Sequence, residues 1–361
     1  MGASNIAMTH PDEGRTRWID AAKGLGILLI VVGHIWSTVT PTLAYIYIYA
    51  FHVPLFFFVS GVTLRPGAGS LVSVVAKKVR TLLVPYLWYS LLGYLFYLTG
   101  YLLAQHRGVH IPQFDHGLWA PLMGILYGTI GEGRLVNGPL WFVVALFCVF
   151  CLGYVVNTYI RRPVWQWVAV GLLSAIGFGL AGEVALPFSG VPVLISLVFF
   201  QAGYRMPLDA WWQASSAMAR WACLGALALV LAFAPINGFI QLGEGLVGNP
   251  LAFLLFAFCG LLATVVLLRQ FDRHTRWLAW VGRYSLSIVL IHMLIIKAVK
   301  VVLTMLLQVR MEAIDSDPLL GLLVLGMTLV LLVPSVYVME RYLPFTLGKS
   351  SAVARQQLAR T

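Results

Sequence analysis

The chain has 361 residues, of which 60% are apolar and only 10% are charged, and its formal net charge is +11. This composition is typical of a polytopic membrane protein and excludes a soluble globular enzyme. No basic stretch is interleaved with exposed polar sequence, so the positive charge does not indicate nucleic-acid binding. Membrane topology explains the charge better, because cytoplasmic loops carry an excess of Lys and Arg.

The N-terminal stretch is polar and contains several charged side chains, unlike a cleavable secretory signal. We therefore expect residues 1–17 to form a cytoplasmic segment. A membrane domain is expected over residues 18–340, followed by a cytoplasmic basic tail over residues 341–361.

The apolar runs predict an all-α polytopic membrane protein with about ten transmembrane helices. The expected spans are about 24–40, 43–63, 82–104, 139–159, 164–182, 190–204, 218–235, 250–268, 283–305 and 318–339. Since ten is even, both termini are expected in the cytoplasm. Most Lys and Arg residues then fall on the inner side, as the positive-inside rule requires.

The first span carries ionisable side chains within RWIDAAKGLGILLIVVGH, residues 17–34. Such groups at membrane depth usually face a functional cavity. Lys23 and His34 are eleven residues apart, so a helix places them on one face about 16 Å apart. His34 is either a base that takes a proton from a hydroxyl or a structural hydrogen-bonding group. Lys23 and Asp20 on the approach to His34 favour the base.

The second span, AYIYIYAFHVPLFFFVSG, carries an aromatic stripe on one helical face. Tyr45, Tyr49, His52 and Phe56 recur at helical spacing along it. His52 is expected to assist His34 as a second base, an orienting group or a hydrogen-bond donor to the substrate. A structural hydrogen bond between helices is the alternative.

A basic connector follows the second span, over residues 65–80. Arg65, Lys78 and Arg80 would lie at the cytoplasmic mouth, where guanidinium and ammonium groups suit phosphates and pyrophosphates. Anchoring to anionic lipid headgroups explains each of them equally well.

Three later residues are also candidates. Asn137 and Trp141 open the fourth span at the outer interface, where an aromatic belt is the alternative explanation. His292 is another intramembrane imidazole, either structural or facing the substrate. Lys297 and Lys300 are expected to snorkel to the outer surface or to face an anionic glycan.

The four cysteines lie within apolar runs and predict no metal site.

Five motifs occur in order along nearly the whole chain. They are a basic residue, ten intervening positions and a histidine (23–34), an FHxPLFFxxSG element with a following arginine (51–65), a basic patch leading to Pro-Tyr (77–86), LWF (140–142) and a serine-to-histidine segment (285–292). Together they resemble the integral-membrane acyltransferase family 3, whose members O-acylate sugars of bacterial polysaccharides and related glycoconjugates. The closest subgroup looks like the fucose 4-O-acetylase-like and exopolysaccharide acetylases. Many relatives carry an acidic residue shortly after LWF, whereas residues 143–147 are apolar here.

The resemblance implies an O-acetyltransferase of the bacterial inner membrane that moves an acetyl group from cytoplasmic acetyl-CoA to a sugar hydroxyl. The acceptor would belong to an exopolysaccharide or another surface glycan, as a lipid-linked precursor. The expected site comprises His34 and His52 as catalytic groups, Lys23, Arg65, Lys78 and Arg80 for the phosphates of coenzyme A, and Asp20, Asn137, Trp141 and His292 for the substrate. Expected partners are a glycan or lipid-linked saccharide, membrane lipids and other polysaccharide-assembly proteins, with no metal and no nucleic acid.

Two alternatives from other classes remain open at this point. A transporter or flippase for a glycolipid or a small solute would use His34 and His52 as a proton relay. The paired broken helices and inverted repeats common in transporters are not visible in the sequence. A non-catalytic subunit of a polysaccharide synthase would tolerate loss of both histidines.

Overall fold

The computed structural model describes residues 12–36, 38–67, 69–105, 111–130 and 135–350. The outer parts of the predicted N-terminal segment and C-terminal tail, residues 1–11 and 351–361, lie outside these ranges. Within them the secondary structure is helical, apart from one isolated bridge between Gln241 and Leu246. The helices are α1 (Asp12–Gly33), α2 (Leu43–Val62), α3 (Leu71–Lys78), α4 (Val84–Gln105), α5 (Ala120–Tyr127), α6 (Trp141–Tyr159), α7 (Pro163–Gly179), α8 (Gly190–Arg205), α9 (Leu208–Ala214), α10 (Ala217–Leu231), α11 (Pro250–Gln270), α12 (Arg276–Arg283), α13 (Ser285–Leu307), α14 (Met311–Ser316) and α15 (Pro318–Tyr342).

Eight helical stretches in the described part of the chain are long and apolar enough to cross a membrane. They are Leu43–Val62, Leu71–Leu103, Gly138–Tyr159, Pro187–Arg205, Ala217–Asn237, Pro250–Gln270, Ser285–Leu307 and Pro318–Tyr342. The all-α polytopic class is therefore confirmed. Two of the ten expected spans fall outside this group, because α7 is shorter and α1 carries several charged residues.

The first helix differs from its prediction of about 24–40. It begins at Asp12 and ends at Gly33, and it therefore crosses the predicted segment boundary at residues 17 and 18. The His34 amide bonds to the carbonyl of Val31 at 3.2 Å, which is the tight turn of a helix end. Glycine and the hydroxyl and β-branched residues that precede Pro41 are poor helix formers. His34 consequently lies in the turn after the helix, and not inside a span.

The basic connector predicted over residues 65–80 is partly helical. Ser70 caps α3 by accepting the Ser73 amide at 3.2 Å. A π-helical segment, Val79–Leu83, then joins α3 to α4 without a break. Pro85 lacks the N–H that an α-helix needs at this position, which is a physical reason for the local change of hydrogen-bonding pattern. Lys78 is thereby carried on a helix and not on a loop.

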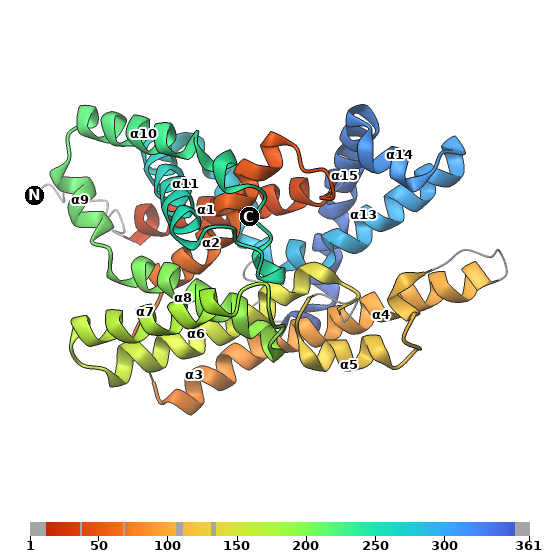
Figure 1. The fold of residues 1–361 in the computed structure, drawn as a ribbon, viewed down its shortest axis with the longest axis horizontal. Coiled ribbons are helices and arrows are strands. Elements are labelled where there is room, and N and C mark those ends of the chain that lie inside the picture. The colour runs from red at the N-terminus through yellow and green to blue at the C-terminus, as the bar shows by residue number, and fades with distance from the viewer. Residues whose placement is uncertain (1–11, 37, 68, 106–110, 131–134, 351–361) are drawn as a thin grey trace, which may run out of the picture.

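The first two helices lie at the centre of the bundle (Figure 1). Helix α1 packs mainly against α12 and α2, and α2 packs against α8 and α11. Glycines permit these close approaches, since a Cβ at Gly24 would overlap the carbonyl of Leu278 and a Cβ at Gly282 would overlap that of Asp20. Small residues at helix crossings are a common device of membrane bundles.

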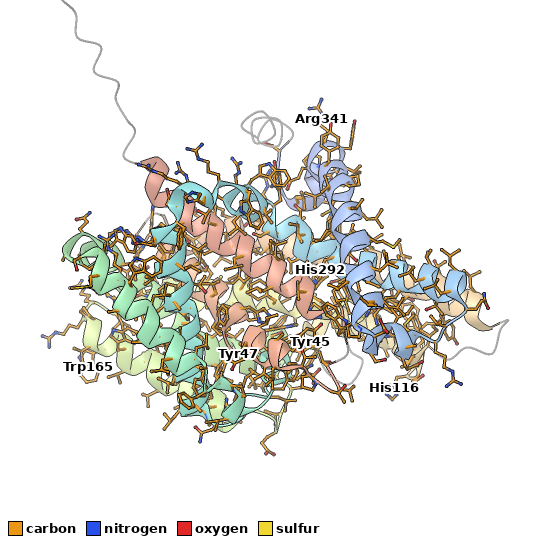
Figure 2. All side chains as sticks on the ribbon, turned by 90° about the horizontal axis from the view of Figure 1, so that it is seen from above. Tyr45, Tyr47, His116, Trp165, His292 and Arg341 are labelled. Atoms are coloured by element: carbon orange, nitrogen blue, oxygen red, sulfur yellow. The ribbon has the colours of Figure 1, made fainter. Side chains whose placement is uncertain are left out.

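The outward faces of the bundle remain apolar. Helix α10 packs against α11 and has no buried residue. Helix α15 exposes Leu319, Val330 and Val333. Figure 2 shows Trp165 at the periphery, whereas His292 lies in the interior. Hydrocarbon-facing helices are expected to show this distribution, with polar groups kept inside.

We expect Gly24→Ala to destabilise the fold, because the added methyl group meets the backbone of α12. Overpacking of this kind costs about 1–3 kcal/mol. The matched control is Gly225→Ala in α10, where a Cβ has nothing within 4 Å. Thermal unfolding of the purified proteins in one detergent should show a lower Tm for Gly24→Ala alone. Equal Tm values for the two variants would contradict the packing argument.

Candidate functional site

Three imidazoles lie together in the interior, contributed by three separate elements. They are His34 after α1, His52 on α2 and His292 on α13. The rings of His34 and His292 have centroids 5.4 Å apart and planes inclined by 34°. His52 faces the same cavity as His34. The structure therefore groups histidines that are far apart in the sequence.

His34 and His52 line a cavity of about 220 Å³, hereafter the histidine cavity. Tyr49, Trp141 and Gln241 contribute to the same wall. The Tyr49 and His52 rings meet edge to face, with centroids 4.9 Å apart. The cavity thus combines two imidazoles with aromatic and amide groups that can contact a polar, ring-shaped ligand.

Hydrogen bonds define the tautomers of two imidazoles. His52 Nδ1 lies 2.7 Å from the carbonyl of Ile48, and His292 Nδ1 lies 3.0 Å from that of Val289. Because a carbonyl only accepts, each Nδ1 carries a proton, and each neutral ring can only accept at Nε2. His292 is fully buried, and its Nε2 has no hydrogen-bond partner among the described residues. It is an acceptor beside the His34 ring.

A second cavity of about 390 Å³, hereafter the lysine cavity, lies further toward the N-terminal end of α1 than the histidine cavity. Asp20, Lys23, Lys78 and Arg283 line it. Lys23 Nζ donates to Asp20 Oδ1 at 3.1 Å, and Lys78 Nζ lies 3.6 Å from the centroid of the Phe150 ring. Three cations against one carboxylate give this cavity the electrostatics of an anion-binding site.

The two cavities meet at a common wall formed by Phe142 and Val289. Phe142 packs edge to face against Phe56 and Phe57, with centroids 5.3 and 5.5 Å apart. Phe142 and Val289 therefore face the cations of one cavity and the imidazoles of the other. A ligand with a charged end and a slender reactive end could therefore occupy both cavities through this wall.

Two predicted substrate residues differ in accessibility. Trp141 lines the histidine cavity. Asn137 is fully buried, and its Nδ2 donates to the carbonyl of Leu290 at 3.2 Å. Its neighbours Gly138 and Pro139 line the cavity in its place. Like His292, Asn137 lies behind the cavity wall, and its role toward a substrate stays a prediction.

Two predicted phosphate-binding residues lie outside the lysine cavity. Arg65 is exposed in the loop after α2. Arg80 is also exposed, and its Nε donates to the carbonyl of Gly348 at 2.9 Å. The structure therefore brings Lys23 and Lys78 together without either arginine.

Some site residues were missed by the sequence analysis. Gln241 and Gly243 belong to the loop before α11, which covers the histidine cavity. Gln241 Nε2 donates to Glu244 Oε1, and reciprocal backbone bonds join Gln241 to Leu246. The concentration of polar residues and glycines between two apolar runs was the available signal. Nothing in that signal places the loop beside His34, some 200 residues earlier in the chain.

The fold and the paired cavities define a multi-pass membrane protein with an internal site. Over residues 16–339 the chain matches the family model described as an acyltransferase domain. The chain belongs to this family, acyltransferase family 3, and it is an acyltransferase. Comparisons with curated proteins and with solved structures found no match. The family result supports the acyltransferase prediction over the transporter alternative.

We expect Gly243→Ala to lower acyl transfer, because a Cβ there would lie 2.6 Å from the Trp141 indole. Either the indole moves within the histidine cavity or the loop lifts from it, and overpacking costs about 1–3 kcal/mol. The control is Leu246→Ala in the same loop, since Leu246 is exposed. Initial rates of acyl transfer should fall several-fold only in Gly243→Ala. Equal rates in both variants would mean that the loop does not shape the site.

Proposed function

We propose that this acyltransferase moves an acetyl group from cytoplasmic acetyl-CoA to a sugar hydroxyl of an exopolysaccharide or other surface glycan, as a lipid-linked precursor. The observation that carries the proposal is the shared wall of Phe142 and Val289 between a cationic cavity and an imidazole cavity. Acetyl-CoA has the complementary shape, with phosphates at one end and a thioester on a slender arm at the other.

The donor would bind through its phosphates in the lysine cavity. Lys23, Lys78 and Arg283 all line that cavity and supply positive charge. Asp20 pairs with Lys23 and holds the ammonium group at the cavity wall. We assign Arg65 and Arg80 to outer parts of the donor, because the terminal nitrogens of Arg80 are not used in its bond to Gly348. The arm of the donor would then pass Phe142 to place the thioester near His34.

His34 would act as the general base. It takes the proton of the acceptor hydroxyl while that oxygen attacks the thioester carbonyl carbon. The carbon–sulfur bond breaks, and the proton passes from His34 to the leaving thiolate, so that the products are the acetyl ester and coenzyme A. Attack by His34 itself, giving a transient acyl-imidazole, is the second route open to this geometry.

The imidazole neighbours would orient the reacting groups. His292 can accept an N–H from His34 at Nε2, which leaves the other His34 nitrogen free to act as a base. No carboxylate is hydrogen-bonded to His34 among the described residues, so His292 would take the place of an acidic partner. His52 can accept from the acceptor hydroxyl at Nε2, and Trp141 offers an apolar face for a sugar ring.

The distribution of charge supports an orientation with the lysine cavity toward the cytoplasm. Arg283 lies at the end of α12, which follows the basic stretch near Arg269, and Lys23 lies on the same side. The positive-inside rule places such stretches in the cytoplasm. The histidine cavity would then open toward the outer side of the bacterial inner membrane, where the glycan and other polysaccharide-assembly proteins would meet the enzyme.

We expect His34→Ala to abolish acetyl transfer, since a general base contributes about 10²- to 10⁴-fold. Transfer from labelled acetyl-CoA to glycan should be measured in membranes with matched protein abundance. His116→Ala is the control, because His116 is exposed and lines neither cavity. Binding of acetyl-CoA to purified His34→Ala protein should persist, whereas Lys23→Met with Lys78→Met should weaken it. Unimpaired transfer by His34→Ala would overturn the proposal.

We expect Val289→Phe to impair acetyl transfer without impairing donor binding. Val289 lines both cavities, and a larger ring would obstruct the passage between them. The affinity for coenzyme A, measured by calorimetry, should change little, while kcat for acetyl transfer should fall by about tenfold or more. Val289→Ala, which leaves more space between the cavities, is the control and should keep most of kcat. Parallel loss of binding and kcat in Val289→Phe would argue against a donor that spans the wall.

A further inference from the structure

The backbone carbonyls at the end of α1 are bonded by side chains from another helix. Tyr45 Oη donates to the carbonyl of Val32 at 2.8 Å, and Tyr49 Oη donates to that of Gly33 at 2.7 Å. The Tyr45 hydroxyl also accepts the amide of Trp36 at 2.8 Å. The last carbonyls of a helix have no partner within the helix, so these phenols complete the end of α1.

Lys300 of α13 continues this capping beyond the helix. Its Nζ donates to the carbonyl of Ile35 at 2.6 Å and to Asp315 of α14. Lys300 is only 3% exposed, so the prediction that it reaches the outer surface or faces a glycan is wrong. A buried ammonium group is unfavourable unless it is paired and fully hydrogen-bonded. Asp315 supplies the pair, and the Ile35 carbonyl supplies a further acceptor.

His34 lies between the two capped positions. The carbonyl before it, at Gly33, is bonded by α2, and the carbonyl after it, at Ile35, is bonded by α13. Because the backbone is held on both sides, the imidazole has little freedom other than rotation of its own side chain. A reacting group must be held near its productive geometry, and a misplacement of about 1 Å can cost about 10²-fold in rate.

The outer connection adds a further contact to the same turn. Trp36 Nε1 donates to the carbonyl of Asp317, at the start of α15, at 3.2 Å. Gly321 leaves the space for this indole, since a Cβ there would overlap it. Lys300 thus connects the turn to Asp315 on the short helix α14. Trp36 contacts the chain directly after that helix, at Asp317. The segment between α13 and α15 thereby becomes part of the support for the site.

We propose that the Lys300–Asp315 ion pair is a positioning device for His34, acting through the carbonyl of Ile35. Lys300 and Asp315 are positioning residues, and they need not touch the donor or the acceptor. The inference rests on the proposed function, in that His34 is taken as the reacting imidazole. Its structural part, that the ion pair determines the placement of the His34 ring, can be tested without any turnover.

The kinetic test uses Lys300→Met, Asp315→Asn and Lys300→Arg in the full-length protein. Lys300→Met and Asp315→Asn should lower kcat by about tenfold to a hundredfold. KM for acetyl-CoA should stay within about twofold, because the lysine cavity lies at Asp20 and Lys23 of α1, away from the Ile35 carbonyl that Lys300 contacts. Lys300→Arg, which keeps the charge and the donors, should restore at least part of kcat. Lys297→Met is the matched control, since Lys297 on the same helix makes neither contact.

The second readout is the rate at which diethyl pyrocarbonate modifies His34, followed by mass spectrometry of the purified protein. This rate should change at least threefold in Lys300→Met and stay constant in Lys297→Met. If His34→Ala keeps its activity, the proposed function fails, yet the modification rates still report on the ion pair. Unchanged modification of His34 in Lys300→Met would overturn the inference. A lower Tm, a raised KM and a lower kcat together, without rescue by Lys300→Arg, would also overturn the inference. The ion pair would then have a purely structural role.

Discussion

The end of α1 at Gly33 is the constraint on which the site depends. Helix α1 carries Lys23 to the lysine cavity and brings the chain to His34 at the histidine cavity, and the turn then places the imidazole beside α2 and α13. Had the helix continued, its backbone carbonyls would be bonded internally and unavailable to Tyr45, Tyr49 and Lys300. The capped turn therefore links the position of one side chain to two other helices, α2 and α13.

The separation of the two cavities follows from the membrane environment. Lys23, Lys78 and Arg283 line one cavity, whereas the imidazoles of the other lie among aromatic and aliphatic side chains. Phe142 and Val289 line both cavities, and in the proposed reaction this apolar partition would limit water near His34. In the proposed reaction this arrangement would favour acyl transfer, because water would otherwise compete with the acceptor hydroxyl for the thioester.

Prediction from the sequence was most successful where a physical signal is local. Apolar runs identified the helical class, and five motifs in order along the chain indicated the family that the comparison confirms. It failed at the helix end after Gly33, because helix boundaries are weakly encoded compared with helix interiors. It also failed for Lys300, since a lysine near the end of an apolar helix resembles a snorkelling residue until its buried partner is known.

The sequence by itself determined the membrane class and the acyltransferase family, and it placed Lys23 on an apolar helix that leads to His34, because composition, motif order and helical spacing are properties of a linear chain. Only the tertiary structure decided that His292 is the ring beside His34, that Gln241 covers the cavity, and that Asp315 pairs with Lys300. These contacts join residues 15 to about 260 positions apart. Their partners are chosen by how helices pack, and neither hydropathy nor periodicity contains that information.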